Sequence, residues 1–450
     1  MRTLKQLADD LASSRATSRG LVESCLAAAR NPNGEGRRVF LTLNESQALA
    51  AADDYDRLRA NGRAPSPFAG IPISIKDLFD MTEEVTTAGT TWLRGSAPAK
   101  KDAVSVARLR AAGFVPIGRT NMTEFAFSGL GLNPHYGTPL NPFDRKAARI
   151  PGGSSSGAAV SVADGMCFAG LGTDTGGSCR IPAAMCGIVG FKPTQRRVPL
   201  AGTLPLSTSL DSIGPLANSA ECCAIVDAVI AGETQPLPDP PELRGLRFAV
   251  PQNYVLDAMD DTVANAFDRA LTALAKSGAQ LDEIDVPAFD TLRDINRKGG
   301  IVTAEAYALH REWLDLHAAE YDPRVASRIL RGKEQDAADY IDLLHARATF
   351  IETVGEIFIR YDAVLMPTVP IVAPILASLE KDDDYARINA LALRNPSIVN
   401  FLDGCAISIP CHETGQAPVG LMLCGVGGAD RSLLATAVAV ERALAKSKND

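Results

Sequence analysis

Two stretches rich in glycine and serine hold the residues with the clearest potential for chemistry: 152–157 (GGSSSG) and 172–180 (GTDTGGSCR). The glycines of the second stretch let the backbone curl, so several consecutive N–H groups can point at one anion. Ser178 lies near the end of this stretch. It could attack a carbonyl carbon while the N–H groups stabilise the oxyanion that forms. The pattern therefore predicts acyl transfer to a serine.

A serine nucleophile needs a base, and the five histidines do not supply a convincing one. Three of them fall in helical patterns between 303 and 361, and His412 lies in a loop region. His135 is close to the glycine-rich stretches, and we expect it to be structural. A lysine can replace histidine when burial or nearby cations lower its pKa. Lys76 ends the apolar run 71–75 and is a candidate, although this position alone is more typical of a surface lysine.

Two other motif matches are rejected on their context. Residues 153–157 (GSSSG) fit the nucleophile elbow G-x-S-x-G, which would select Ser155. That motif requires a preceding strand, whereas 144–150 is mostly charged and small. Residues 113–120 (GFVPIGRT) nearly match a phosphate-binding loop, with Arg119 in place of lysine, but their interior is typical of an apolar strand.

Composition excludes several classes of function. The net charge of -8 and a pI near 5.3 argue against nucleic acid or an anionic membrane as partner. The N-terminus lacks the apolar core of a secretory signal, and no stretch approaches the ~20 apolar residues of a membrane span. The nine cysteines are odd in number and lack zinc-ligand spacing. We therefore expect a cytoplasmic protein with free thiols, without a metal or another cofactor.

Helical patterns alternate with short apolar runs along most of the chain. This alternation predicts an α/β fold with a large mixed, mostly parallel β-sheet covered by helices on both faces. Asn44, with Gln47 three residues later, is typical of a capping box for a helix that ends near 61–62. Other predicted helices cover 102–112, 262–277, 335–360 and 431–445, and predicted strands cover 71–75, 114–117 and 363–366.

The glycine-serine stretches resemble the signature of the amidase signature family. The family pattern is a GGSS loop, a GTDTGGS segment and an R-x-P-A tail. The resemblance extends from about residue 2 to 445 and is densest between 66 and 216. Further matching segments are 74–77 (SIKD), 120–126 (TNMTEFA), 187–194 (GIVGFKPT), 209–215 (SLDSIGP), 400–410 and 418–421.

The resemblance implies a metal-free catalytic triad with Ser178 as nucleophile, Ser154 as bridging serine and Lys76 as base. Family members hold the bridging serine after a cis peptide, and the resemblance implies that Gly153–Ser154 is the corresponding bond here. The departures from the family pattern, Ser156 and Arg119, do not fall on the triad. The implied oxyanion donors are the backbone N–H groups of Thr175, Gly176, Gly177 and Ser178, and the implied supporting residues are Thr173, Asp174 and Arg180.

The resemblance also implies one amidase domain over 1–450. We divide it into N-terminal helices (1–65), a signature core (66–220), a substrate-side region (221–380) and C-terminal strands with a helix (381–450). The proline-rich segment 232–241 is interpreted as a loop within this domain. The expected partners are a small-molecule amide and, in a homodimer, a second copy of the chain.

The expected activity is hydrolysis of a linear carboxylic amide, or a related ureide, to an acid and ammonia or an amine. One alternative is the glutaminase (A) subunit of a tRNA-dependent amidotransferase, although 129–133 and the segment after 214–215 differ from that protein. The other alternative is a non-catalytic binding protein on the same fold.

The substrate cannot be decoded from the sequence. The pocket walls are expected from 120–140, from the helices between 300 and 360, and from a loop at 369–376. Arg180 is interpreted mainly as a structural partner of Asp174, with contact to a substrate carboxylate as the second interpretation. Arg324 and Arg328 could attract an acidic or ureide-like substrate, although solvated helix arginines are the more common case.

Overall fold

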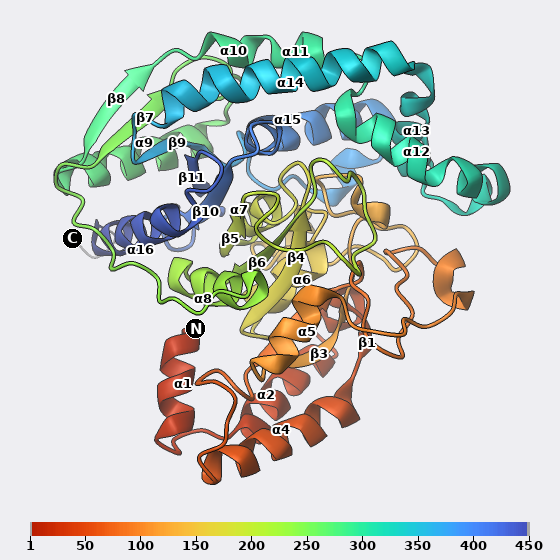
Figure 1. The fold of residues 1–450 in the computed structure, drawn as a ribbon, viewed down its shortest axis with the longest axis vertical. Helices are drawn as coiled ribbons and strands as arrows, with labels where there is room; N and C mark the ends of the chain where they lie inside the picture. Colours follow the sequence, from red (N-terminus) through yellow and green to blue (C-terminus); the bar gives the residue numbers. More distant parts are fainter. Residues whose placement is uncertain (1, 448–450) are drawn as a thin grey trace.

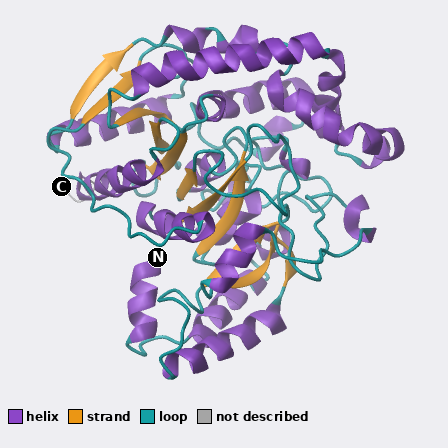
Figure 2. Cartoon of the chain, in the orientation of Figure 1, coloured by secondary structure: helices purple, strands orange, loops and turns teal. Residues whose placement is uncertain are grey.

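The computed structural model describes residues 2–447, which fold around one 11-stranded β-sheet with helices on both faces (Figure 1). The sheet has the order β1-β3-β2-β4-β6-β5-β10-β11-β9-β7-β8. Figure 2 shows the strands as a central layer between helices, with long loops gathered beside it. The strands are β1 (Phe40–Leu43), β2 (Pro72–Lys76), β3 (Val115–Thr120), β4 (Ala169–Asp174), β5 (Val189–Lys192), β6 (Ser212–Ala217), β7 (Arg247–Pro251), β8 (Gln280–Ile284), β9 (Ala363–Pro367), β10 (Cys405–Pro410) and β11 (Gly420–Gly425).

The helices form two layers, because strands such as β2, β4, β5, β6 and β9 are buried on both faces. One layer contains α5, α8, α9 and α16, and the other contains α2, α4, α6 and α7. Helices α12, α13, α14 and α15 form a further group beside the sheet. The helices are α1 (Leu4–Ala12), α2 (Ser18–Arg30), α3 (Gly36–Val39), α4 (Glu45–Ala60), α5 (Val104–Ala111), α6 (Ser156–Ala163), α7 (Arg180–Cys186), α8 (Ala220–Ala231), α9 (Asp261–Lys276), α10 (Pro287–Asp290), α11 (Leu292–Ile295), α12 (Gly300–His317), α13 (Pro323–Leu330), α14 (Ala337–Phe358), α15 (Asp382–Phe401) and α16 (Asp430–Ser447).

The predicted α/β fold with a mixed sheet is confirmed, but the expectation of a mostly parallel sheet is wrong. Four strand pairs are parallel: β2–β3, β2–β4, β7–β8 and β7–β9. The other six pairs are antiparallel. The reason is that helix-linked parallel units occur only toward the two ends of the sheet, whereas β6, β5, β10 and β11 join them with alternating direction.

The predicted helix after Asn44 is present, but the predicted capping box is wrong. Helix α4 begins at Glu45 with Asn44 as N-cap, and the Asn44 side chain makes no capping hydrogen bond. Its amide nitrogen instead donates to Glu84 Oε1 at 2.7 Å. A tertiary contact from a buried side chain has thus replaced the local cap that the sequence pattern indicates.

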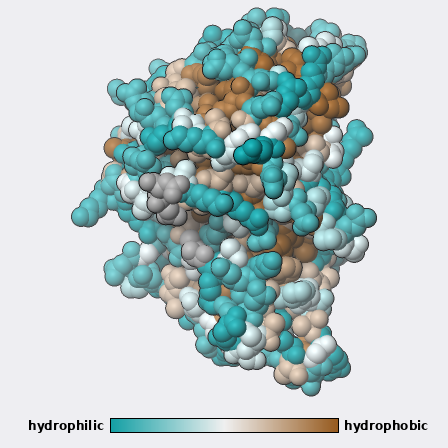
Figure 3. Space-filling model, turned by 90° about the vertical axis from the view of Figure 1, so that its left-hand side faces the viewer, coloured by the Kyte–Doolittle hydropathy of each residue, from teal (hydrophilic) through white to brown (hydrophobic). Residues whose placement is uncertain are grey.

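The surface of the molecule is mainly polar on the face shown in Figure 3. Apolar side chains gather near the top of this face and in a smaller patch at mid-height on the right. None of the helices among residues 2–447 is long and apolar enough to cross a membrane. All nine cysteines lie within residues 2–447 and are buried, and none of them forms a disulfide there.

A glycine in β5 lets α7 lie directly on the sheet. A Cβ atom added at Gly190 would meet the carbonyl oxygen of Cys179 at 2.3 Å and the Cβ of Ala183 at 2.7 Å. Backbone atoms cannot give way as a flexible side chain can, so this position requires glycine. The contact holds the segment that follows Ser178 against the sheet.

We predict that Gly190→Ala lowers the free energy of unfolding by about 1–3 kcal/mol, because the added methyl group overpacks the contact with α7. Urea denaturation of wild type and variant measures the difference. Gly355→Ala in α14 is the matched control, since an added Cβ there meets nothing within 4 Å. The control is expected to gain about 1 kcal/mol in helix propensity. Equal effects of the two substitutions would contradict the packing argument.

Candidate active site

Lys76 lies at the end of β2, which is hydrogen-bonded between β3 and β4. Its side chain is fully buried. The ammonium nitrogen donates to Ser154 Oγ at 2.8 Å and to Thr173 Oγ1, on the neighbouring strand β4, at 2.7 Å. The structure therefore brings the predicted base and bridging serine into direct contact, with Thr173 as the second partner.

Burial lowers the pKa of Lys76 to about 8, because the charged ammonium loses its hydration. The carboxylates of Asp211 and Asp174 oppose this shift electrostatically and offset only part of it. Both hydrogen-bond partners of the nitrogen are neutral hydroxyl groups. A substantial neutral fraction near pH 8 suits a general base.

The glycine-serine loop presents Ser154, and not Ser155, to the lysine. The Gly153–Ser154 peptide is cis, as the family resemblance implies. The Ser155 hydroxyl donates to the carbonyl of Thr173 at 3.3 Å, and its backbone N–H donates to the carbonyl of Ser178 at 3.3 Å. Ser155 thereby joins the two glycine-rich stretches, and Ser154 is left to bond Lys76.

The Asp174 carboxylate organises the segment that carries Ser178. It accepts the backbone N–H groups of Gly177 at 2.8 Å and Cys179 at 3.1 Å. Although burial favours the neutral acid, Arg180 and Asn400 outweigh burial and hold the pKa of Asp174 well below its usual range. A permanent carboxylate thus sets the curl of this loop.

The loop geometry narrows the predicted set of four oxyanion donors. The Gly177 N–H is bound to Asp174. Among the loop and side-chain hydrogen bonds of residues 2–447, none uses the N–H of Thr175, Gly176 or Ser178. These three residues also line the adjoining cavity. Asp211 accepts a hydrogen bond from the Thr175 hydroxyl at 2.5 Å and stabilises this side of the loop. Burial raises the pKa of Asp211 to about 6.

The Arg180 side chain makes its hydrogen bonds to other residues of the chain. Its guanidinium donates to both carboxylate oxygens of Asp174, at 2.8 and 3.0 Å, to the Asn400 side chain at 2.7 Å and to the carbonyl of Pro396 at 2.9 Å. The side chain is fully buried and is not among the residues that line the cavity. This placement supports the structural interpretation of Arg180 over contact with a substrate carboxylate.

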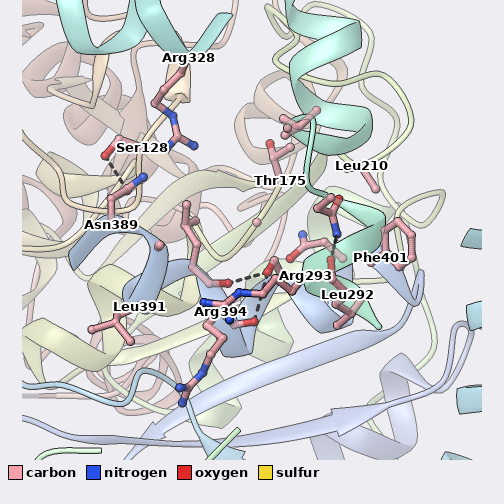
Figure 4. A pocket seen from close by; sticks show the side chains of 18 of the residues that line it. Ser128, Thr175, Leu210, Leu292, Arg293, Arg328, Asn389, Leu391, Arg394 and Phe401 are labelled. Atoms are coloured by element: carbon pink, nitrogen blue, oxygen red, sulfur yellow. Dashed lines mark hydrogen bonds between the residues drawn. The ribbon is translucent and has the colours of Figure 1, made fainter. Parts of the chain in front are cut away.

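A cavity of about 940 Å³ opens beside Ser178 (Figure 4). As expected, residues near 126–128 and part of the region 300–331 line it. The expected loop 369–376 does not appear in the lining. A wall that the sequence analysis missed is α15, which contributes Asn389, Arg394 and Asn400 among others.

The two arginines proposed for substrate binding lie in different surroundings. Arg324 pairs with Asp382 at 2.8 Å, donates to the carbonyl of Glu380 and is not among the lining residues. Arg328, four residues later on α13, lines the cavity. His135 binds Glu124 at 2.8 Å and lies outside the lining, as expected of a structural residue.

Comparison with known proteins identifies the family. The family model described as Amidase matches residues 21–434. The chain belongs to the amidase family. A solved structure described as "Crystal structure of amidase" superposes with a TM-score of 0.89 at 32% identity and covers 98% of this chain and 99% of its own. The chain is thus a hydrolase of the amidase family, which acts on carbon–nitrogen bonds.

Two curated amidase-family relatives are similar to nearly the same extent. A 2-amino-5-chloromuconic acid deaminase of Comamonas testosteroni is 35% identical, over 94% of this chain and 92% of its own. The A subunit of the glutamyl-tRNA(Gln) amidotransferase of Chloroflexus aggregans is also 35% identical, over 96% of this chain and 94% of its own. Overall identity therefore does not distinguish between their activities.

We predict that Arg180→Met lowers the free energy of unfolding of this chain by about 3–5 kcal/mol, because it leaves the Asp174 carboxylate buried without a cation. Urea denaturation measures the loss. The double variant Asp174→Asn/Arg180→Met removes the stranded charge and is expected to recover part of the stability. A double variant less stable than Arg180→Met would argue against the buried pair as the cause.

Proposed function

We propose that this amidase hydrolyses carboxylic amides through an acyl-enzyme on Ser178, with Ser154 as proton relay and Lys76 as base. The contact between the buried Lys76 nitrogen and Ser154 Oγ is the observation that carries this proposal. The lysine in this contact has a pKa of about 8. The loop that carries Ser154 is hydrogen-bonded to the segment of Ser178 through the Ser155 N–H. The cavity beside Ser178 provides space for the substrate.

The proposed reaction begins with two linked proton transfers. Neutral Lys76 accepts the proton of Ser154, Ser154 accepts that of Ser178, and Ser178 Oγ forms a bond to the amide carbonyl carbon. Ser178 Oγ makes no hydrogen bond within residues 2–447, so its hydroxyl must turn toward Ser154 when substrate binds. The carbonyl oxygen gains the negative charge and accepts the N–H groups of Thr175, Gly176 and Ser178.

Collapse of this intermediate breaks the C–N bond. Ser154 gives a proton to the nitrogen, which leaves as ammonia or an amine, and takes back a proton from Lys76, which becomes neutral again. The acyl group stays on Ser178. Water then loses a proton through Ser154 to Lys76 and attacks the ester carbon. When the acid leaves, Lys76 passes this proton back through Ser154 to the Ser178 oxygen, which completes the cycle.

We predict that Ser178→Ala lowers the kcat for amide hydrolysis by about 1000-fold or more, since the nucleophile is lost. Ser154→Ala and Lys76→Ala are expected to give losses of similar size, because the three residues act as one unit. Ammonia release measures activity. A fluorophosphonate probe should label wild type at Ser178 and leave Ser178→Ala unlabelled. Full turnover by Ser178→Ala would falsify the assignment.

We predict an acidic limb in the pH profile of kcat/KM. Lys76 acts as base only when neutral, so activity should rise about tenfold per pH unit below pH 8 and level off above it. Burial also lowers the pKa of Lys192 to about 8, although its nitrogen donates to the carbonyls of Pro193 and Gly404. The Lys192→Met variant is therefore the matched control and should keep the limb. Loss of the limb in this variant would assign the ionisation to Lys192 instead.

A second candidate function is the glutaminase component of a tRNA-dependent amidotransferase, which the relative from Chloroflexus aggregans supports as strongly as the first. Affinity purification of the tagged chain from its own cells separates the two. A lone chain with amide hydrolysis supports the first function, and stable association with two further proteins supports the second. Labelling failure at Ser178 would instead favour a non-catalytic binding protein.

A further inference from the structure

One end of the amidase cavity presents hydrogen-bond donors without protein acceptors. Arg328 from α13 and Asn389 from α15 line this end together with Ser128. Figure 4 shows the Arg328 and Asn389 side chains extending toward the same region of the cavity. The Arg328 Nε and the Asn389 Nδ2 are both buried, and neither has a partner among residues 2–447.

The orientation of the Asn389 amide is fixed by its neighbours. Its Oδ1 accepts the backbone N–H of Gly129 at 2.9 Å and the hydroxyl of Ser128 at 3.0 Å. A backbone N–H can only donate, so the oxygen of the amide must face Gly129 and the NH2 group must face the cavity. Tyr385 fixes the Ser128 hydroxyl in turn by donating to it at 2.7 Å. Asn389 itself is only 1% exposed.

Arg328 is held by an aromatic ring and not by a carboxylate. Its guanidinium lies over the Phe127 ring at 4.7 Å from the centroid. Within the described part of the chain, it makes no ion pair, whereas Arg324 on the same helix is paired with Asp382. A desolvated guanidinium without an anion costs free energy that a bound carboxylate offsets.

The surrounding lining favours an anion although the whole chain carries a net charge of -8. Two aspartates, Asp257 and Asp290, line the cavity. Only one of the lining arginines has an ion pair in residues 2–447, namely Arg387 with Asp384 at 3.3 Å. The lining arginines are Arg293, Arg328, Arg331, Arg387 and Arg394. This local excess of positive charge attracts negatively charged ligands.

We propose that Arg328 and Asn389 bind a carboxylate of the substrate, so that the amide cleaved at Ser178 belongs to a carboxylic acid. The guanidinium neutralises the charge, and the locked amide NH2 supplies a second donor from another helix. A neutral amide leaves both donors unpaired and is therefore selected against. This inference rests on the proposed function, because it names the substrate class of the same site.

The test compares pairs of amides that differ only in charge. Each pair holds a linear dicarboxylic acid monoamide and the amide with a methyl group in place of its carboxylate. The series runs from three to six carbons, so the preferred chain length reports the reach from Ser178 to Arg328. Wild type should prefer the acidic member by about 10- to 100-fold in kcat/KM at the best length. Equal kcat/KM within every pair would overturn the proposal.

Substitutions then assign the preference to the two residues. Asn389→Ala and Arg328→Met should each raise KM for the acidic amide by about tenfold or more and leave the neutral amide within about twofold. Asn389→Asp preserves the acceptor for Gly129 and Ser128 but turns an oxygen toward the cavity, so it should exceed Asn389→Ala in its effect. Losses of equal size for both members of a pair would indicate a purely structural role and overturn the assignment.

Two controls separate this inference from the proposed function. Arg324→Ala removes a charge one helical turn away, outside the cavity lining, and should keep the preference. If Arg324→Ala alone lost the preference for the acidic amide, the carboxylate would be bound by Arg324 and not by Arg328 and Asn389. Fluorophosphonate labelling of Ser178 in every variant reports an intact catalytic centre. If Ser178 is labelled and hydrolysis depends on it, but acidic and neutral amides react equally, only this inference is overturned. If no amide is hydrolysed in a Ser178-dependent way, the proposed function itself is overturned.

Discussion

The buried carboxylate of Asp174 is the constraint on which the amidase site depends. It ends β4, bonds two N–H groups of the loop that follows, and meets Arg180 at the start of α7. Asn400 from α15 bonds the same carboxylate at 2.9 Å. One ionised group therefore ties together the sheet, the nucleophile segment, the helix behind it and a helix of the cavity wall. Its charge is tolerated because every part of it is hydrogen-bonded.

The same arrangement explains why the proposed base can be a lysine. Lys76 ends β2, a strand that is bonded on both edges and buried on both faces, so little water reaches it. The negative charge of Asp174 is largely neutralised by Arg180, so it does little to stabilise an ammonium group nearby. Burial then dominates the pKa of Lys76, while Thr173 and Ser154 satisfy its hydrogen bonds.

The sequence was sufficient to predict features that depend on local spacing. The strand that ends at Lys76 and most helices in the two main layers follow from short patterns. The family resemblance selected Ser154 over Ser155, and Ser154 is the serine that contacts Lys76. Features that depend on distant segments were missed. The wall formed by α15 lies about 210 residues after Ser178 in the chain, and no local pattern connects them. The cap expected at Asn44 failed for the same reason, because Glu84 captures its side chain.

Arg324 and Arg328 show most directly what local sequence patterns cannot predict. They are four residues apart on one helix, so periodicity places them on the same face and treats them alike. Only their tertiary contacts distinguish them: Arg324 meets Asp382 and Arg328 meets Phe127. Direction of the sheet strands is a similar case, since the order in which antiparallel strands join two parallel units is a property of the whole chain.

Cys179 follows Ser178 in the chain, yet it offers a very different chemistry. Its backbone N–H is held by Asp174, its sulfur contacts the carbonyl of Gly214 at 3.5 Å, and it is fully buried. Burial raises the pKa of the thiol, which keeps it protonated and a poor nucleophile. Electrophiles that enter the cavity therefore encounter the Ser178 hydroxyl and no thiolate from the next residue. In the proposed reaction, acylation of Ser178 therefore meets no competition from sulfur at the next position.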